Sequence, residues 1–356
     1  MKPQKPLQKQ LFWLIKWLSK ARQKSANSGF TLTEILVSMI VAGIIMSGLM
    51  TVMVELLTSD ARETARNETQ QEMQMAMDYI AADIREAVFV YDGNCLDGQT
   101  AACGEGALFN SLDVPNPDDT VPILAFWKLD DLPEDAMDQC NFNNLDDPNT
   151  AHIPCISGRM YTLVVYFFTR NNVDEAGGGS GPWAGMGRIR RAEHRQFDGQ
   201  GNLNSNYIPL GSSNSGFESW PNGATVQMST PLTLVDFVDD RPMDVIAQQQ
   251  DVAGMDVSCP PNYNLTPSEN TLSEGFGGMR NFYACVLDEV GRREEAREQE
   301  RSQDDDDTAF NQRVILFIRG NAAGKPGIRS ANEGFMPAIQ TQVVNRSVPR
   351  KRPRQF

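Results

Sequence analysis

The apolar positions of the chain follow two different patterns in its first hundred residues. From Ile35 to Val54 twenty consecutive residues carry no charge. A helix of this length, rising about 1.5 Å per residue, covers a hydrocarbon core about 30 Å thick. Further on, apolar residues recur at spacings of four, three, four and four: Met73, Met77, Ile80, Ile84 and Val88. The first pattern predicts a membrane-spanning helix, and the second predicts an amphipathic helix with one apolar stripe.

We expect the two patterns to belong to one continuous helix. Residues 49–92 contain no proline and no glycine, and residues 60–88 are rich in strong helix formers. The turn signal Asp92-Gly93-Asn94 is the predicted end. Residues 59–71 lack an apolar face and are expected to be solvated or to pack against neighbouring subunits. The outward faces are assigned to the charged residues Arg62, Glu63, Arg66, Glu68, Glu72, Asp83, Arg85 and Glu86.

The rest of the chain alternates strand patterns with loops. The clearest strand is 160–170, which is β-branched and aromatic and apolar on both faces, so we expect it at the centre of a sheet with the helix on one side. Weaker strand patterns cover 121–128, 188–197, 230–238, 282–288, 311–320 and 338–344. The predicted class is α+β, a long N-terminal helix packed on an antiparallel sheet.

All six cysteines follow the apolar run. An even number of cysteines in an exported domain predicts disulfides, and six allow fifteen connectivities. Short loops favour Cys95–Cys103 and Cys140–Cys155, which leaves Cys259–Cys285. No Cys-x-x-Cys pair is present and the two histidines are isolated, so no zinc site is expected.

The charge before the apolar run sets the orientation of the helix. Residues 1–29 hold seven basic residues and no acidic residue. By the positive-inside rule this end stays in the cytoplasm, so the remainder is expected in the periplasm. The first charge after this basic stretch is Glu34, a carboxylate at the edge of the apolar run, where it is a candidate functional residue.

The junction Gly29-Phe30-Thr31-Leu32-Thr33-Glu34, between a basic leader and an apolar run, resembles the type IV prepilin signal. The resemblance implies that a prepilin peptidase cuts between Gly29 and Phe30 and that Phe30 becomes N-methylated. It also matches Glu34 to the family's carboxylate at the fifth position of the mature chain, with an expected role in assembly with other pilins. The alternative interpretation is an ordinary signal-anchor helix.

Removal of the leader makes the chain strongly acidic. It leaves 25 basic and 46 acidic residues, a formal charge of −21. Nucleic acid is therefore not expected as a partner, because phosphate binding needs clustered basic residues. The expected partners are the peptidase, other pilins or pseudopilins, the inner membrane and an assembly platform.

A strand at 160–170, a Gly-rich stretch and an Arg-rich strand at 188–197 are similar to minor pilins and pseudopilins of the J/W type. Arg188, Arg190 and Arg191 bind either an anionic partner or local acids, and we favour local acids. With the long leader and the chain's size, the closest likeness is to the minor pseudopilins of cyanobacterial hormogonium polysaccharide secretion. This implies a non-enzymatic subunit of an export filament. The alternatives are a type IV pilus minor pilin for motility, adhesion or DNA uptake, and a membrane-anchored adhesin outside any filament.

No catalytic constellation or cofactor motif is present in the sequence. Oxygen-rich stretches at 198–204 and 304–307 leave a calcium site open, although neither has EF-hand spacing. The basic tail, 346–356, is expected to be disordered, and it either contacts anionic groups or folds back on the acidic body. The predicted organisation is a cleaved leader (1–29), a transmembrane or filament-core helix (30–57), its amphipathic continuation (58–92), a β-rich ectodomain (93–345) and the tail.

Overall fold

The computed structural model describes residues 30–98, 108–113, 119–140, 153–171, 184–210, 217, 220–221, 224–242, 258–273, 278–287 and 312–345. These residues divide into two compact units, one reaching to Thr58 and one beginning at Ser59. The predictions for the leader, Cys103, residues 304–307 and the tail concern residues outside this description. Helix α2, Leu32–Arg85, contributes to both units.

The first unit is the apolar part of α2. Its N-terminus is capped by Thr31, whose side-chain oxygen accepts the Glu34 N–H at 3.3 Å. Among the described residues, α2 is the helix that is long and apolar enough to cross a membrane. The length and composition of the chain therefore allow the predicted single span.

In the second unit α2 ends earlier than the sequence pattern predicts. The helix stops at Arg85, and β1 occupies Ala87–Val90 instead of a further helical turn. These residues pair antiparallel with β2, with Ala87 opposite Lys128 and Val90 opposite Phe126. The apolar and β-branched character of Ala-Val-Phe-Val suits a strand, and this tertiary pairing overrides the helical spacing that includes Val88.

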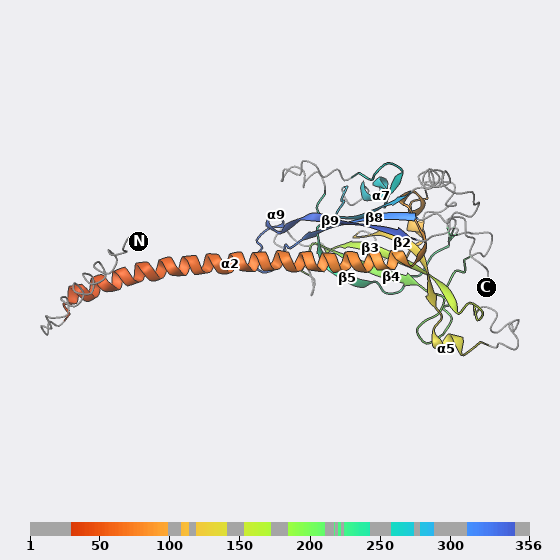
Figure 1. Cartoon of the computed structure of the whole chain (residues 1–356), viewed down its shortest axis with the longest axis horizontal. Helices are drawn as coiled ribbons and strands as arrows, with labels where there is room; N and C mark the ends of the chain where they lie inside the picture. The colour runs from red at the N-terminus through yellow and green to blue at the C-terminus, as the bar shows by residue number, and fades with distance from the viewer. Residues whose placement is uncertain are drawn as a thin grey trace, which may run out of the picture. The chain divides into compact units, whose positions relative to one another are not determined.

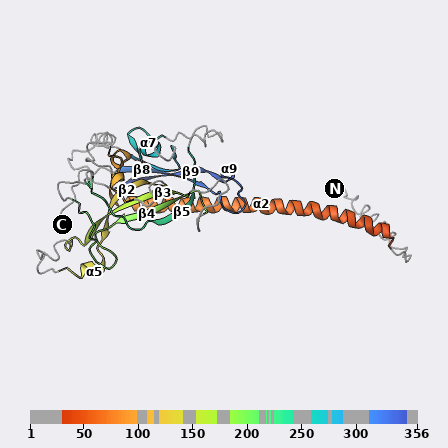
Figure 2. The same ribbon diagram turned by 180° about the vertical axis from the view of Figure 1, so that it is seen from behind.

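The described strands form one antiparallel sheet in the order β1-β2-β3-β4-β5-β8-β7-β6, with β9 also paired to β8. β4 and β5 lie near the C-terminal half of α2 in both ribbon views (Figures 1 and 2). The strands are β2 (Thr120–Asp131), β3 (Arg159–Arg170), β4 (Gly187–His194), β5 (Leu232–Val238), β6 (Tyr263–Thr266), β7 (Phe282–Leu287), β8 (Gln312–Asn321) and β9 (Phe335–Asn345). Short helices lie between them: α3 (Gly93–Leu96), α4 (Leu108–Ser111), α5 (Glu134–Met137), α7 (Glu269–Ser273) and α9 (Ala331–Gly334).

Strand β3 separates two hydrophobic cores. One set of alternate residues, including Val164 and Phe168, lies in the core that contains the α2 stripe. The other set, including Val165 and Phe167, lies in a second core with Trp127. This explains why the strand is apolar on both faces, and it confirms the predicted central position under the helix.

The amphipathic stripe holds α2 against the sheet. Met73, Met77, Ile80 and Ile84 are all almost completely buried in the first core. Each large apolar side chain buried in this way contributes about 1.5 to 3 kcal/mol relative to an exposed one. The stripe is therefore a large favourable contribution to the packing of α2 on the sheet.

Most of residues 59–71 are exposed, as expected for a solvated segment, but one side of this part of α2 packs within the second unit. Ala65 and Thr69 are buried. The Arg66 guanidinium donates through Nε to the backbone carbonyl of Glu333 at 3.0 Å. The segment before β9 covers this part of the helix, and small and polar side chains permit the contact where no apolar stripe exists.

Strands β5 and β8 are only loosely paired in the sheet. Within the described residues these strands pair at one position, Val238 opposite Gly320. In contrast, β8 pairs with β9 along almost its whole length. The edge of β5 that faces away from β4 therefore has no partner strand among the described residues before Val238.

Candidate functional site

The apolar part of α2 is exposed throughout the first unit. Every residue from Phe30 to Asp60 is exposed, and Phe30 itself is 78% exposed. Soluble monomers rarely expose a continuous apolar surface of this length. The surface therefore requires either a lipid environment or the apolar faces of other subunits.

Glu34 is the acidic residue in the first turn of this helix. Its side chain has no ion pair within the part of the chain that the structure describes. Gly29, the residue before the predicted cut, lies outside the described residues. The structure thus gives an exposed carboxylate beside an apolar helix start, with Phe30 four residues before it.

A second charged site fixes the other end of α2 to the sheet. Asp83 is only 8% exposed and accepts hydrogen bonds from residues on three strands. Arg191 Nε on β4 and the Tyr166 hydroxyl on β3 each donate to Asp83 Oδ2 over 2.7 Å. Lys128 Nζ on β2 lies 3.4 Å from Asp83 Oδ1. One helical carboxylate therefore joins three adjacent strands.

The electrostatics of this cluster keep Asp83 and Arg191 charged and Tyr166 neutral. Burial alone would raise the pKa of Asp83, but hydrogen bonds from Arg191 and Tyr166 outweigh burial and lower that pKa. Burial opposes the charged form of Arg191 as well, yet Asp83 raises its pKa. The pKa of Tyr166 is raised by its burial and by the neighbouring carboxylate. Asp83 is therefore ionised next to the positively charged guanidinium of Arg191. Tyr166 keeps its hydroxyl proton and donates it in a hydrogen bond to Asp83.

The prediction that Asp83 lies on the outward face of the helix is wrong, because its side chain is buried against the sheet. Asp83 directly precedes Ile84 of the apolar stripe, so it lies at the flank of the buried face. Burial is tolerated there because both carboxylate oxygens have partners. The periodicity of the sequence contains no signal for this burial, because the basic partners of Asp83 lie on strands far from it in the chain.

The three arginines of β4 have different partners. Arg191 pairs with Asp83 and also with Glu193, over 2.5 Å, as the favoured interpretation predicts. Arg188 donates to the side-chain oxygen of Asn171, and Arg190 donates to the carbonyl of Pro231. The observed contacts of all three lie within the chain.

Of the two stretches considered for calcium, the structure describes 198–204. This stretch forms a turn held by hydrogen bonds to Asp198. Asp198 Oδ1 accepts the backbone N–H groups of Gln200 and Asn202 at 2.9 Å, and Oδ2 accepts from the Asn202 side chain at 3.0 Å. Its oxygens thus face hydrogen-bond donors. No group of three or more His, Cys, Asp or Glu side chains placed to hold a metal occurs in the described residues.

The described cysteines are disulfide-bonded, and one of them, Cys285, lies within strand β7. Cys140 is bonded to Cys155, and Cys259 is bonded to Cys285. Cys95 is also disulfide-bonded. Its expected partner, Cys103, lies outside the described residues. The first bond joins the segment after α5 to the segment before β3, and the second joins the segment before β6 to β7.

His194 is a core residue, and both of its ring nitrogens have hydrogen-bond partners in the chain. Its Nδ1 lies 2.7 Å from the carbonyl of Gln227, and its Nε2 accepts the Ile208 N–H at 3.3 Å. Its ring stacks on Tyr207. Burial lowers the pKa of His194. The neutral imidazole is therefore the form that these contacts favour.

Comparison with known proteins finds one family model. Residues 24–50 match the prokaryotic N-terminal methylation motif. No curated protein and no solved structure matches the chain. The matched residues include the whole Gly29–Glu34 junction and most of the apolar run. The motif, together with α2 packed on an antiparallel sheet, is consistent with an α+β fold of the type IV pilin kind. A motif of this kind implies processing by a prepilin peptidase and assembly with other pilins.

Proposed function

We propose that the chain is a minor pseudopilin, a structural and non-enzymatic subunit of a filament related to type II secretion systems and type IV pili. In this proposal the peptidase cuts between Gly29 and Phe30 and methylates Phe30. The mature chain then spans the inner membrane once, with Phe30 near the cytoplasm and the ectodomain in the periplasm.

The observation that carries the proposal is Glu34 on the exposed apolar surface of α2. A carboxylate that moves into a packed apolar filament core loses its water, at a cost of several kcal/mol when it remains unpaired. The new amine of Phe30 on an adjacent subunit supplies a cation at the matching depth. Glu34 is therefore a docking residue whose role exists between subunits and not within one chain.

The disulfides support the proposed compartment. Disulfides persist in oxidising compartments such as the periplasm and are rare in the cytosol. The basic residues before Phe30 favour a cytoplasmic N-terminus by the positive-inside rule. Both features agree with an ectodomain outside the inner membrane.

Export of polysaccharide or protein is the activity that we assign to the filament. This choice rests on the sequence resemblance to large minor pseudopilins. A pilus minor pilin and a free membrane-anchored adhesin remain the competing functions. The adhesin differs from both filament roles because it does not need Glu34.

The mass of the mature protein tests the processing step. Protein purified from membranes should begin at Phe30 and carry one added methyl group. Gly29→Glu should leave the leader attached, because a bulky charged side chain does not fit the scissile position. A native chain that retains residues 1–29, or a Gly29→Glu variant that still begins at Phe30, would contradict the assignment.

A further inference from the structure

An open groove of about 570 Å³ lies between α2 and β5 in the second unit. Its helical wall consists of Glu72, Met75, Ala76 and Tyr79, and its other wall includes all of Thr233–Phe237. Five consecutive strand residues line the groove, although successive side chains of a strand point to opposite faces. The groove therefore follows the edge of β5.

The edge of β5 beside the groove has little strand pairing in the described part of the chain. One side of β5 is paired with β4, and the other side is paired at Val238 alone. The backbone N–H and C=O groups along such an edge accept an added extended segment. The occupant that this wall fits is therefore a strand, which would lie between β5 and α2.

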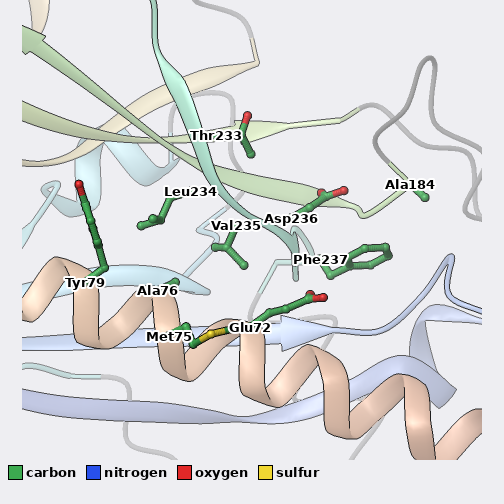
Figure 3. A pocket seen from close by; sticks show the side chains of 10 residues that line it. All are labelled: Glu72, Met75, Ala76, Tyr79, Ala184, Thr233, Leu234, Val235, Asp236 and Phe237. Carbon is green, nitrogen blue, oxygen red and sulfur yellow. The ribbon is translucent and has the colours of Figure 1, made fainter.

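One end of the groove, where Tyr79 lies on the side of Leu234, is apolar and exposed (Figure 3). Met75 is 57% exposed and Tyr79 is 48% exposed on the helix, and Leu232, at the start of β5, is 72% exposed. Large apolar side chains that gather on a surface mark a site of association. The guanidinium of Arg191, 6.0 Å from the centre of the Tyr79 ring, is already paired with a carboxylate. This end therefore fits uncharged, apolar side chains.

The other end of the groove is acidic. In Figure 3 Phe237 lies above Glu72 at this end. Lys325 Nζ is 2.9 Å from Glu72 and 3.7 Å from Glu68, so two carboxylates share one ammonium. With Asp236 there are three carboxylates and one ammonium, a formal net charge of −2. The charge at this end favours a cationic group in the occupant.

Asp236 also has unused capacity to accept hydrogen bonds. Its Oδ2 accepts the Gly185 N–H at 3.2 Å, whereas its Oδ1 is buried without a hydrogen-bond partner among the described residues. Buried polar atoms in proteins are normally paired, and an unpaired one costs free energy. The carboxylate is therefore suited to a lysine or arginine side chain of the occupant.

Distances along α2 set the pattern of the occupant. Tyr79 follows Glu72 by seven residues, which is about 10.5 Å along a helix, and Met75 lies between them. In an extended segment, side chains on one face recur about every 6.6 Å. Apolar side chains beside Tyr79 and Met75 and a cation beside Glu72 thus take alternate positions, in the pattern apolar-x-apolar-x-basic.

We propose that the α2–β5 groove binds an extended segment of a different protein chain, with this pattern, as an added strand on the open edge of β5. A second copy that paired through the same edge would bring further carboxylates to the acidic end, and like charges oppose such a pairing. The proposal does not rest on the filament function, since it requires only the second unit.

Photoreactive peptides test the proposal on the purified full chain in detergent. The probes are Val-Thr-Val-Thr-Lys and its reverse, because a strand can be added in either direction, and benzoylphenylalanine replaces the central Val of each. At least one probe should crosslink, with saturable yield, to residues 72–79 or to β5. Exchanging the Lys with the adjacent Thr moves the cation to the opposite face, and this control peptide should give at least about fivefold less product. No crosslink in either direction, or equal yields from probe and control, would overturn the proposal.

Two substitutions at exposed positions locate the peptide on the protein. Met75→Lys adds a cation to the groove, and Ile156→Lys makes a similar change at a side chain that is 83% exposed and outside the groove. Met75→Lys should lower the probe yield at least about fivefold, and Ile156→Lys should leave it within about twofold. Similar yields from the two variants would show that the peptide binds elsewhere, and the proposal would be wrong.

The source of the natural segment is tested in the native cell, with benzoylphenylalanine placed at Tyr79. The crosslinked peptide, identified by mass spectrometry, should come from a different protein and contain apolar-x-apolar-x-Lys or apolar-x-apolar-x-Arg. A peptide from the same chain or from a second copy, a peptide without this pattern, or the absence of any product would contradict the proposal.

Discussion

Arg191 Nε donates a hydrogen bond to Asp83 Oδ2 across 2.7 Å, although 108 residues separate the two in the chain. Asp83 lies on α2 and Arg191 on β4, so the contact joins the helix to the sheet. Since Tyr166 and Lys128 also contact this carboxylate, one helical position determines how α2 is rotated against three strands. The apolar stripe provides most of the buried surface of the helix, and Asp83 fixes the rotation of the helix about its axis.

Removal of the Asp83 carboxylate should destabilise the second unit strongly. Asp83→Ala leaves Arg191 and Lys128 without their shared buried partner, and breaking a buried pair in this way costs about 3 to 5 kcal/mol. Urea unfolding of the full chain, followed by circular dichroism in detergent, measures the change. Asp78→Ala, an exposed helix position one turn earlier, is the matched control and should change stability by less than about 0.5 kcal/mol. Similar values for both variants would show that the cluster does not hold the helix.

Asp240 should make stability decrease with rising pH in the mildly acidic range. Burial raises its pKa to about 6, from 3.8 for the ordinary side chain, despite Arg170 at 3.7 Å. The folded state therefore binds the proton more tightly than the unfolded state does. This stabilisation is complete below about pH 4 and is lost as pH rises through about 6.

Comparison with Asp240→Asn isolates this effect, since the amide does not titrate. The free energy of unfolding of the wild type, measured from pH 4 to pH 7, should fall relative to that of Asp240→Asn by about 1 to 3 kcal/mol. The difference should level off above pH 7. A constant difference between the two proteins across this range would mean that Asp240 titrates normally.

The disulfides predict a specific thiol pattern. Loss of Cys259 should leave Cys285 as a free thiol, but Cys285 is fully buried, so it should react with iodoacetamide only after unfolding. Cys140→Ser should release Cys155 in the same way. Peptide mass spectrometry after alkylation identifies the reactive residue. Six alkylated cysteines in wild-type protein purified without reductant would contradict an exported, oxidised domain.

Local patterns in the sequence predicted most of the elements of the fold. Two patterns are long enough to distinguish a helix from a strand. They are the apolar stripe from Met73 to Ile84, which is helical, and the strand 160–170, which is apolar on both faces. Strand β1 was missed because Val88 continues the helical spacing, and its strand conformation depends on pairing with β2, more than thirty residues later. Strand β6 is four residues long and gives no readable period.

The two charged sites differ in how far the sequence reveals them. Glu34 lies within a contiguous motif, so residue order alone identifies it as a candidate. Asp83 and Arg191 meet only after β2, β3 and β4 align under the helix, and single-sequence periodicity contains no information on that alignment. The groove beside β5 likewise depends on which strand edge remains unpaired.

Filament incorporation of Glu34→Val tests the central claim most directly. The variant and Glu55→Val, a control that removes the other carboxylate near the apolar run, are each expressed in the native cell, where the N-terminal mass and the amount in sheared filament or pseudopilus fractions are measured. Both variants should be inserted and cleaved at Gly29, and Glu55→Val should assemble. Glu34→Val should remain in the membrane fraction, with export lost, because its docking carboxylate is absent. Normal cleavage together with normal incorporation of Glu34→Val would contradict the proposed role of this residue and would favour a simple membrane anchor.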